Sequence, residues 1–133
     1  MAAEPFSVLL VDDHQDTRDM LALLLDEWGY RATIVSTATE GLKRLLDRSF
    51  DIIVLDNWLP DLDGIELCRQ IREFNRQTPI IFFSAAAMGS EDRAALAAGA
   101  NAYVYKGSGL GVLREAMAEE LRKSNTQHRN QPQ

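Results

Sequence analysis

The stretch that decides the fold is residues 50–64, which read FDIIVLDNWLPDLDG. Its apolar part, 52–55, is too short for a helix and rich in β-branched residues, which predicts a strand buried on both faces. Asp56 ends this strand, in the crevice where open α/β sheets bind ligands. A second apolar run, 6–11, ends in Asp12 and Asp13. We therefore expect three carboxylates to converge at one edge of one sheet.

The length and composition indicate one globular domain in a reducing compartment. The chain has 133 residues, of which 46% are hydrophobic and 26% charged, and a single cysteine, Cys68. No basic segment typical of a signal peptide opens the chain, and no stretch approaches the roughly 18 apolar residues of a membrane span. The net charge of −6 argues against nucleic acid as a direct partner, because duplex binding needs a basic surface. We expect a cytoplasmic protein without membrane insertion.

Short apolar runs alternate with helical patterns along the chain. The strand-like runs are 6–11, 32–35, 52–55, 80–83 and 102–105, and each is followed by apolar residues at helical spacing. Five such units predict an α/β fold, with a parallel sheet covered by helices on both faces. We place the domain at 6–123, after a short extension at 1–5 and before a polar tail at 124–133 that we expect to be disordered. If the chain is complete, this domain works alone.

Two further polar residues end strands of the predicted sheet: Ser84 follows 80–83, and Lys106 follows 102–105. Neighbouring carboxylates repel by about 4 kcal/mol per pair at 4 Å and an effective dielectric of 20, which favours a bound cation or a retained proton. Oxygen ligands on a rigid sheet edge suit Mg²⁺ best and Mn²⁺ next. Acids, metal, hydroxyl and ammonium together are the parts used in phosphoryl transfer, and an Asp carboxylate can itself accept the phosphoryl group.

The order of these residues resembles the receiver domain of two-component response regulators, the CheY-like family, over about residues 6–123. The family loop D-x-x-[LM]-P-x-[LM]-[DS]-G matches residues 56–64 at every defined position. The resemblance implies a flavodoxin-like, doubly wound (βα)5 fold with strand order 2-1-3-4-5. In that family an acidic pair, the phosphoacceptor Asp, a Ser or Thr, an aromatic residue and a Lys occupy fixed strand positions, which here are Asp12 with Asp13, Asp56, Ser84, Tyr103 and Lys106.

The resemblance also implies a metal site and a phosphoryl acceptor. Asp13, Asp56 and the backbone carbonyl of Trp58 would bind Mg²⁺, and Asp12 would act through a bound water. Asp56 would take the phosphoryl group from a sensor histidine kinase, a histidine phosphotransfer protein or acetyl phosphate. Lys106 would bind the phosphoryl oxygens. The chain would then be a phosphoacceptor of a phosphorelay rather than an enzyme.

Ser84 and Tyr103 would couple phosphorylation to a partner surface. By the resemblance, Ser84 binds the phosphoryl group and moves inward, which frees space for Tyr103 to swing in. The movement changes the face formed by the fourth helix, the fifth strand and the fifth helix, where an unknown downstream protein binds. Physically this is a population shift between two pre-existing states.

Two residues depart from the family pattern. Gly107 stands where the family usually has a proline after a cis peptide bond, and because a cis bond to a non-proline residue costs about 2.5–4 kcal/mol, we expect a trans peptide. With its three glycines, 107–111 is expected to be mobile. Trp58 is large for a position beside the phosphoryl pocket, and we expect its indole to restrict water and so lengthen the phosphorylated lifetime.

Alternative interpretations remain open at this point. The chain could be a degenerate receiver that binds a partner without phosphorylation, or a metal-dependent phosphatase with an Asp nucleophile. Trp58 argues against the phosphatase, because that position would carry the general acid. The glycines of 107–111 do not fit a dinucleotide-binding loop, since Val112 occupies the third glycine position. His14 directly follows the acidic pair and could reach the site, but a surface role at a helix start is the favoured interpretation.

Overall fold

The computed structural model describes residues 4–86 and 89–130. Its centre is a parallel sheet of five strands in the order β2-β1-β3-β4-β5. The predicted strands and the implied order are therefore confirmed. The strands are β1 (Ser7–Val11), β2 (Arg31–Val35), β3 (Ile52–Leu55), β4 (Ile80–Ser84) and β5 (Ala102–Tyr105).

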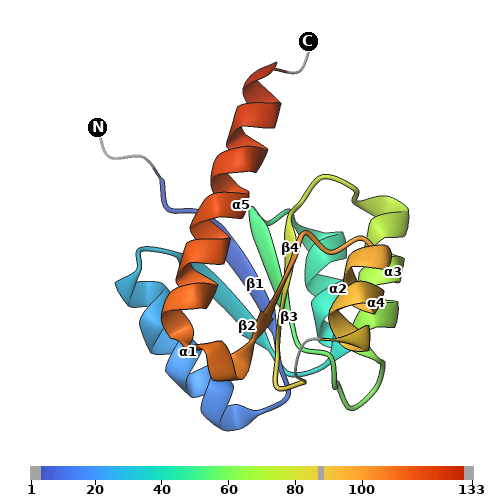
Figure 1. Ribbon diagram of the computed structural model, residues 1–133. Coiled ribbons are helices and arrows are strands. Elements are labelled where there is room, and N and C mark those ends of the chain that lie inside the picture. The colour runs from blue at the N-terminus through green and yellow to red at the C-terminus, as the bar shows by residue number, and fades with distance from the viewer. Residues whose placement is uncertain (1–3, 87–88, 131–133) are drawn as a thin grey trace.

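Helices cover both faces of the sheet (Figure 1). On one face lie α1 (Gln15–Glu27) and α5 (Leu110–Asn130), and on the other lie α2 (Ala38–Asp47), α3 (Gly64–Phe74) and α4 (Ser90–Ala97). A short 3-10 turn, η1 (Lys106–Ser108), joins β5 to α5. Within 4–86 and 89–130, no helix combines the length and the apolar character that a membrane crossing requires.

Each face of the sheet has its own buried core, because successive side chains of a strand point to opposite faces. Leu9 and Ile53 pack in the core beneath α2, α3 and α4, whereas Leu10 and Val54 pack beneath α1 and α5. Every residue of β3 and of β4 is buried, which accounts for their apolar sequences, with Ser84 at the end of β4 as the one polar residue. The carboxyl ends of these strands are thus held by a rigid, close-packed layer.

The loop between β3 and α3 requires a glycine at its end. The backbone N–H of Gly64 donates a 2.8 Å hydrogen bond to the carbonyl oxygen of Asn57. A Cβ atom at position 64 would lie 2.0 Å from the backbone carbonyl oxygen of Asp56, which is far inside van der Waals contact. The glycine of the 56–64 motif therefore lets the start of α3 return against the residue that ends β3.

Helix α5 differs from the expected end of the ordered domain. The polar tail was predicted to be disordered from Ser124, but α5 continues through Asn130 and projects beyond the sheet (Figure 1). Extending an existing helix adds one hydrogen bond for each residue fixed and avoids the cost of nucleation, so a polar sequence can follow. Ion pairs one turn apart, such as Lys123 with Glu120 at 3.4 Å, lie in the part of α5 just before this polar segment. Residues 131–133 of the predicted tail lie outside the described residues.

Candidate functional site at the carboxyl edge of the sheet

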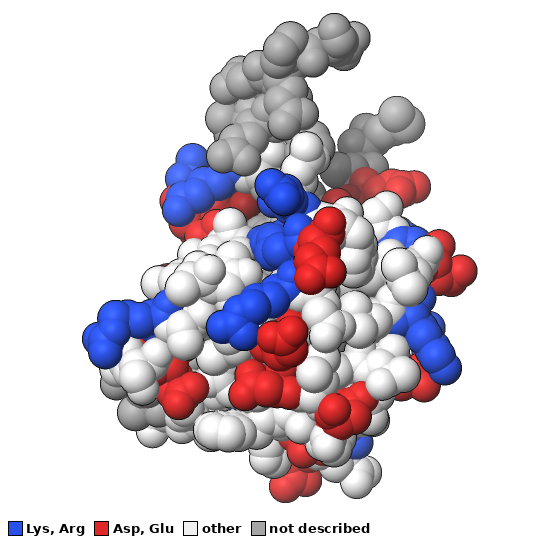
Figure 2. Space-filling model, turned by 90° about the vertical axis from the view of Figure 1, so that its right-hand side faces the viewer, with Lys and Arg blue, Asp and Glu red and all other residues white. Residues whose placement is uncertain are grey.

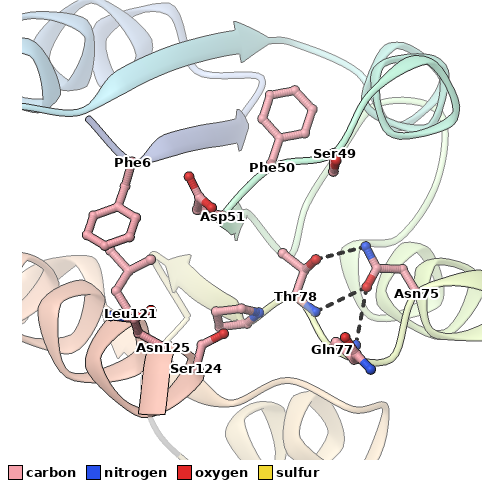
Figure 3. Close-up of a pocket in the computed structure, with 11 residues that line it drawn as sticks. Phe6, Ser49, Phe50, Asp51, Asn75, Gln77, Thr78, Leu121, Ser124 and Asn125 are labelled. Atoms are coloured by element: carbon pink, nitrogen blue, oxygen red, sulfur yellow. Dashed lines mark hydrogen bonds between the residues drawn. The ribbon is translucent and has the colours of Figure 1, made fainter. Parts of the chain in front are cut away.

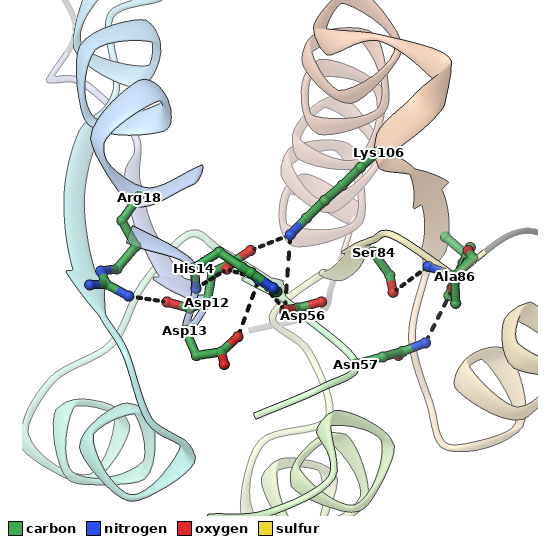
Figure 4. Close-up of polar contacts among 10 residues, drawn as sticks. Asp12, Asp13, His14, Arg18, Asp56, Asn57, Ser84, Ala86 and Lys106 are labelled. Atoms are coloured by element: carbon green, nitrogen blue, oxygen red, sulfur yellow. Dashed lines mark hydrogen bonds and ion pairs between the residues drawn. The ribbon is translucent and has the colours of Figure 1, made fainter. Parts of the chain in front are cut away.

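Three acidic residues meet at the ends of β1 and β3 (Figure 4). These strands are neighbours, and the backbone N–H of Asp56 donates to the carbonyl oxygen of Val11 at 3.0 Å. The pairing brings Asp56 level with Asp12 and Asp13, as the sequence predicted. The side chains of Asp12 and Asp56 are 1% and 0% exposed, whereas Asp13 faces solvent.

Asp56 is a buried carboxylate beside charged groups. Neither of its side-chain oxygens accepts a hydrogen bond from the described residues. Burial, followed by the nearby charge of Asp12, raises its pKa from 3.8 to about 6, although Lys106 and His14 act in the opposite direction. A buried acceptor left unpaired costs about 1–3 kcal/mol, and more when it is charged. The carboxylate of Asp56 is therefore suited to bind a cation or to react with an electrophile, and it does not stabilise the fold.

Lys106 reaches the acids from the end of β5. Its Nζ lies 2.9 Å from Oδ2 of Asp12 and 3.9 Å from Oδ2 of Asp56. The described residues contain no cis peptide bond, so the expected trans bond before Gly107 is confirmed. The chain leaves β5 through η1, which begins at Lys106 itself. The lysine thus contacts both carboxylates without the proline that the family pattern places beside it.

The hydroxyl group of Ser84 and the ring of Tyr103 lie on the two strands beyond β3. Ser84 is fully buried, and its Oγ accepts a 3.2 Å hydrogen bond from the backbone N–H of Ala86. The hydroxyl of Tyr103 donates to the carbonyl oxygen of Ala86 at 2.9 Å, and its ring stacks on Phe82 with centroids 6.1 Å apart. Burial raises the pKa of Tyr103. The aromatic ring is therefore packed inward, only 9% exposed.

Asn57 is a site residue that the sequence interpretation missed. Its side chain is 2% exposed, and Nδ2 donates a 3.2 Å hydrogen bond to the hydroxyl of Tyr103. A direct side-chain contact thus joins the residue after Asp56 to the inward aromatic ring. The available signal was an amide side chain directly after a strand buried on both faces, where a polar group needs a specific partner.

His14 is exposed at the start of α1, as predicted, and its ring also reaches this site, which was the less favoured interpretation. It does precede α1 as the N-cap residue, but its side chain makes no capping hydrogen bond. Instead, Nδ1 lies 3.2 Å from Oδ1 of Asp12, 3.2 Å from Oδ1 of Asp13 and 3.4 Å from Oδ2 of Asp56 (Figure 4). The backbone N–H of His14 donates to Oδ1 of Asp12 at 2.8 Å, which bends the chain so that the ring faces the acids.

The donor set of this edge fits a divalent cation. Asp12, Asp13, Asp56 and His14 each offer one ligand atom, and these atoms all lie within 4.8 Å of one another. Carboxylate oxygens are hard ligands of the kind that Mg²⁺ and Mn²⁺ accept. The buried oxygens of Asp56, which accept no hydrogen bond from the described residues, supply the reason for a cation here. Coordination by the backbone carbonyl of Trp58 stays a prediction.

A pocket at the opposite edge of the sheet lacks such a set of groups (Figure 3). It is lined by Phe6, by residues that precede β3 and β4, and by residues of α5 such as Leu121. The carboxylate of Asp51 already accepts from the backbone N–H of Ser7 at 2.8 Å. The side chain of Asn75 is likewise bonded to Thr78, at 2.9 Å. Polar groups that are satisfied within the fold indicate a structural role.

Known proteins resemble this chain in sequence. The profile of the response regulator receiver domain family matches residues 8–118. The KDP operon transcriptional regulatory protein KdpE of Escherichia coli (strain K12) is 38% identical over 117 residues, which cover 88% of this chain and 52% of that protein. The response regulator MprA of Mycobacterium sp. (strain KMS) is 35% identical over 121 residues, 91% of this chain and 53% of that protein. The chain thus spans about half the length of these curated relatives.

Solved structures agree with the sequence matches. A CheY-like response regulator receiver domain protein from Methanospirillum hungatei JF-1 superposes with a TM-score of 0.87 at 28% identity, covering 92% of this chain and 98% of that one. A receiver domain described as BeF3-activated DrrB gives a TM-score of 0.81 at 25% identity, covering 89% and 98%. The strand order and the helices on both faces are common to these domains.

Proposed function

The chain belongs to the family of response regulator receiver domains, and on this premise we propose that it takes a phosphoryl group onto Asp56 from a histidine kinase or a histidine phosphotransfer protein. The observation that carries the proposal is the state of Asp56. It is fully buried, both of its side-chain oxygens lack hydrogen-bond partners, and a lysine and two further acids surround it.

The transfer is a displacement at phosphorus. The ionised carboxylate of Asp56 attacks the phosphorus of a phosphohistidine, the P–N bond breaks, and the leaving imidazole takes a proton from solvent. The product is an acyl phosphate. Because the pKa of Asp56 is about 6, its carboxylate is mostly ionised at neutral pH and can act as the nucleophile.

The neighbouring residues have separate roles in this proposal. Asp13, Asp56 and the backbone carbonyl of Trp58 would hold Mg²⁺ or Mn²⁺, with Asp12 acting through a bound water, and the cation would neutralise charge on the transferred phosphoryl group. Lys106 moves from Asp12, its partner at 2.9 Å, towards a phosphoryl oxygen. The hydroxyl of Ser84 gives up the Ala86 backbone N–H and donates to another phosphoryl oxygen.

We infer that the readout is the face formed by α4, β5 and α5. The exposed large apolar side chains described on these three elements are those of Leu96, Tyr105 and Val112, which are 49%, 36% and 45% exposed. Movement of Ser84 changes the segment whose Ala86 carbonyl holds the hydroxyl of Tyr103. The phosphoryl group and this face are thereby joined through one short loop.

The partners follow from the same proposal. The phosphoryl donor is a histidine kinase or phosphotransfer protein, and the receiver of the signal is a protein. Basic and acidic side chains are interspersed on the face that Figure 2 shows, which supports protein rather than nucleic acid as the direct partner of this domain. The curated relatives are about twice as long and include transcriptional regulators, so a DNA-binding function would belong to a further domain. A cytoplasmic location is part of the proposal.

Phosphorylation can be tested on the chain with acetyl phosphate and Mg²⁺. We expect intact-mass spectrometry to detect one added phosphoryl group, and peptide mapping to place it on Asp56. The Asp56→Asn variant is the matched control and should remain unmodified. An unmodified wild-type chain, together with unchanged NMR spectra after addition of BeF₃⁻ and Mg²⁺, would instead favour the phosphorylation-independent interaction domain. Sustained release of phosphate from phosphomonoesters would favour the phosphatase, although Trp58 stands where that enzyme would carry its general acid.

A further inference from the structure

We propose that His14 is a direct ligand of the cation held by this site and shifts its preference from Mg²⁺ towards ions that accept nitrogen, such as Mn²⁺, Co²⁺ and Ni²⁺. The inference rests on the proposed function, since it concerns the same cation. It differs from the metal site implied by the resemblance, in which all protein ligands are oxygen atoms.

The position of the imidazole supports this role. Its Nδ1 lies 3.2, 3.2 and 3.4 Å from single carboxylate oxygens of Asp12, Asp13 and Asp56. Ligand atoms about 2.1 Å from one ion and at right angles to each other are about 3.0 Å apart. The nitrogen is therefore spaced from all three oxygens as adjacent ligands of a single small ion are spaced. No other histidine nitrogen is found near the acids in the part of the chain that the structure describes with side chains.

The local backbone holds the ring in this place. His14 has an extended conformation, with φ −84° and ψ 116°, immediately before α1. Its N–H donates to Oδ1 of Asp12, and the side chain of Arg18 donates to the carbonyl oxygen of Asp12 at 3.1 Å. Both contacts tie the turn to the residue that ends β1. The imidazole is consequently attached to the rigid sheet edge rather than to a free loop.

The buried state of Asp56 makes this more than a cluster of surface acids. Its two oxygens lie within the site, 0% exposed and without a hydrogen-bond donor among the described residues. A group of this kind indicates a ligand, because a buried carboxylate whose oxygens accept no hydrogen bond is costly even beside Lys106 at 3.9 Å. His14 is 54% exposed, and it lies between the acidic side chains and the solvent.

The chemistry of imidazole sets the expected selectivity. Mg²⁺ prefers oxygen ligands and retains several waters, so replacing a water by nitrogen gains it little. Imidazole suits later first-row ions, whose affinity for a given site rises from Mn²⁺ through Co²⁺ to Ni²⁺. The presence of His14 should therefore raise the affinity for these ions more than the affinity for Mg²⁺.

The test compares wild type, His14→Ala and His128→Ala in the full chain at one fixed pH. Mn²⁺ and Ni²⁺ binding is followed by calorimetry, and Mg²⁺ by competition against Mn²⁺. Since the loss of groups that only support a metal ligand already costs about 10–100-fold in affinity, we expect His14→Ala to weaken Mn²⁺ and Ni²⁺ by about tenfold or more. Mg²⁺ affinity should change by less than about threefold. His128→Ala, the change of the second of the two histidines, should match wild type.

Pulsed EPR of the Mn²⁺ complex gives a direct readout of the ligand. Wild type and His128→Ala should show modulation from a coordinated imidazole nitrogen, and His14→Ala should lack it. Mg²⁺ binding with unchanged selectivity and no nitrogen signal would overturn the inference but leave the proposed function intact. Tighter binding of Mg²⁺ and Mn²⁺ alike to His14→Ala would also overturn it, because His14 would then compete with the cation. Absence of any divalent binding, in wild type as in Asp56→Asn, would instead count against the proposed function.

Discussion

Replacement of Asp56 by asparagine should stabilise the metal-free protein. In the folded state the pKa of Asp56 is raised from 3.8 to about 6, mainly by burial and then by Asp12. Ionisation at neutral pH is therefore more costly in the folded chain than in the unfolded chain. The difference of about two pKa units corresponds to about 3 kcal/mol at 1.36 kcal/mol per unit. Asparagine has nearly the same shape and removes the charge.

The pH dependence of the gain follows from the sign of the shift. A group with a raised pKa in the folded state contributes stability that is present below about pH 4 and is lost as the pH rises through about 6. Asp56→Asn should therefore be more stable than wild type by up to about 3 kcal/mol at pH 7.5, with the gain declining towards pH 4. Urea unfolding in EDTA, followed by circular dichroism at several pH values, measures this difference.

Controls separate this effect from a general loss of negative charge. Asp19→Asn removes an exposed carboxylate of α1 and should change the free energy of unfolding by less than about 0.5 kcal/mol. Mg²⁺ at about 100 times its dissociation constant should stabilise wild type by about 2.7 kcal/mol and leave Asp56→Asn unchanged. If Asp56→Asn did not raise the free energy of unfolding at pH 7.5, or raised it equally at every pH, the claim that the charge of Asp56 destabilises the folded protein would be refuted.

Three further substitutions test the loop after β3 and its contacts. Gly64→Ala should lower the free energy of unfolding by about 1–3 kcal/mol or more, because its Cβ would lie 2.0 Å from the carbonyl oxygen of Asp56. An unchanged urea midpoint would mean that the loop relaxes to avoid this contact. Asn57→Ala should lower the free energy of unfolding by about 1 kcal/mol and increase the exposure of Tyr103, which loses a 3.2 Å hydrogen bond. The NMR signals of the tyrosine ring report this exposure. Signals identical to those of wild type would show that the hydrogen bond does not hold the ring in place. Trp58→Asn should shorten the lifetime of the acyl phosphate several-fold if the indole restricts water, and an unchanged dephosphorylation rate would exclude that role.

The fold was predictable because each element carries a strong local pattern. The four residues of β3 are all apolar, and burial on both faces in a parallel sheet is the arrangement that satisfies such a run. The convergence of Asp12, Asp13 and Asp56 follows from the same geometry, because parallel strands end at one edge. The extent of α5 was less predictable. Helix propagation past Ser124 depends on the helix already formed, which the composition of a polar segment does not reveal.

Two contacts of the site depend on side-chain direction and could not be read from strand positions. His14 and Asn57 each directly follow a residue of the acidic cluster, and a neighbour in an extended segment ordinarily points to the opposite side. The ring of His14 is returned to the acids by the hydrogen bond between its N–H and Asp12, at 2.8 Å. The amide of Asn57 is instead held on its own side by the hydroxyl of Tyr103, from β5. The direction of Asn57 is therefore set by a partner distant in the sequence, and that of His14 by a local turn of the backbone.

The position of Lys106 shows how charge can replace a backbone constraint. The family pattern places a proline after this lysine, and here Gly107 follows it through a trans peptide bond. The ammonium group nevertheless lies 2.9 Å from Asp12 and 3.9 Å from Asp56, two carboxylates that are almost fully buried. Attraction between opposite charges is strong where water is excluded, so the acids can select this side-chain orientation among the many that a lysine can adopt. Under the proposed phosphorylation of Asp56, a lysine oriented by its partners would be free to leave Asp12 for the stronger negative charge of the phosphoryl group, whereas one aimed by a rigid backbone would already be placed for that group.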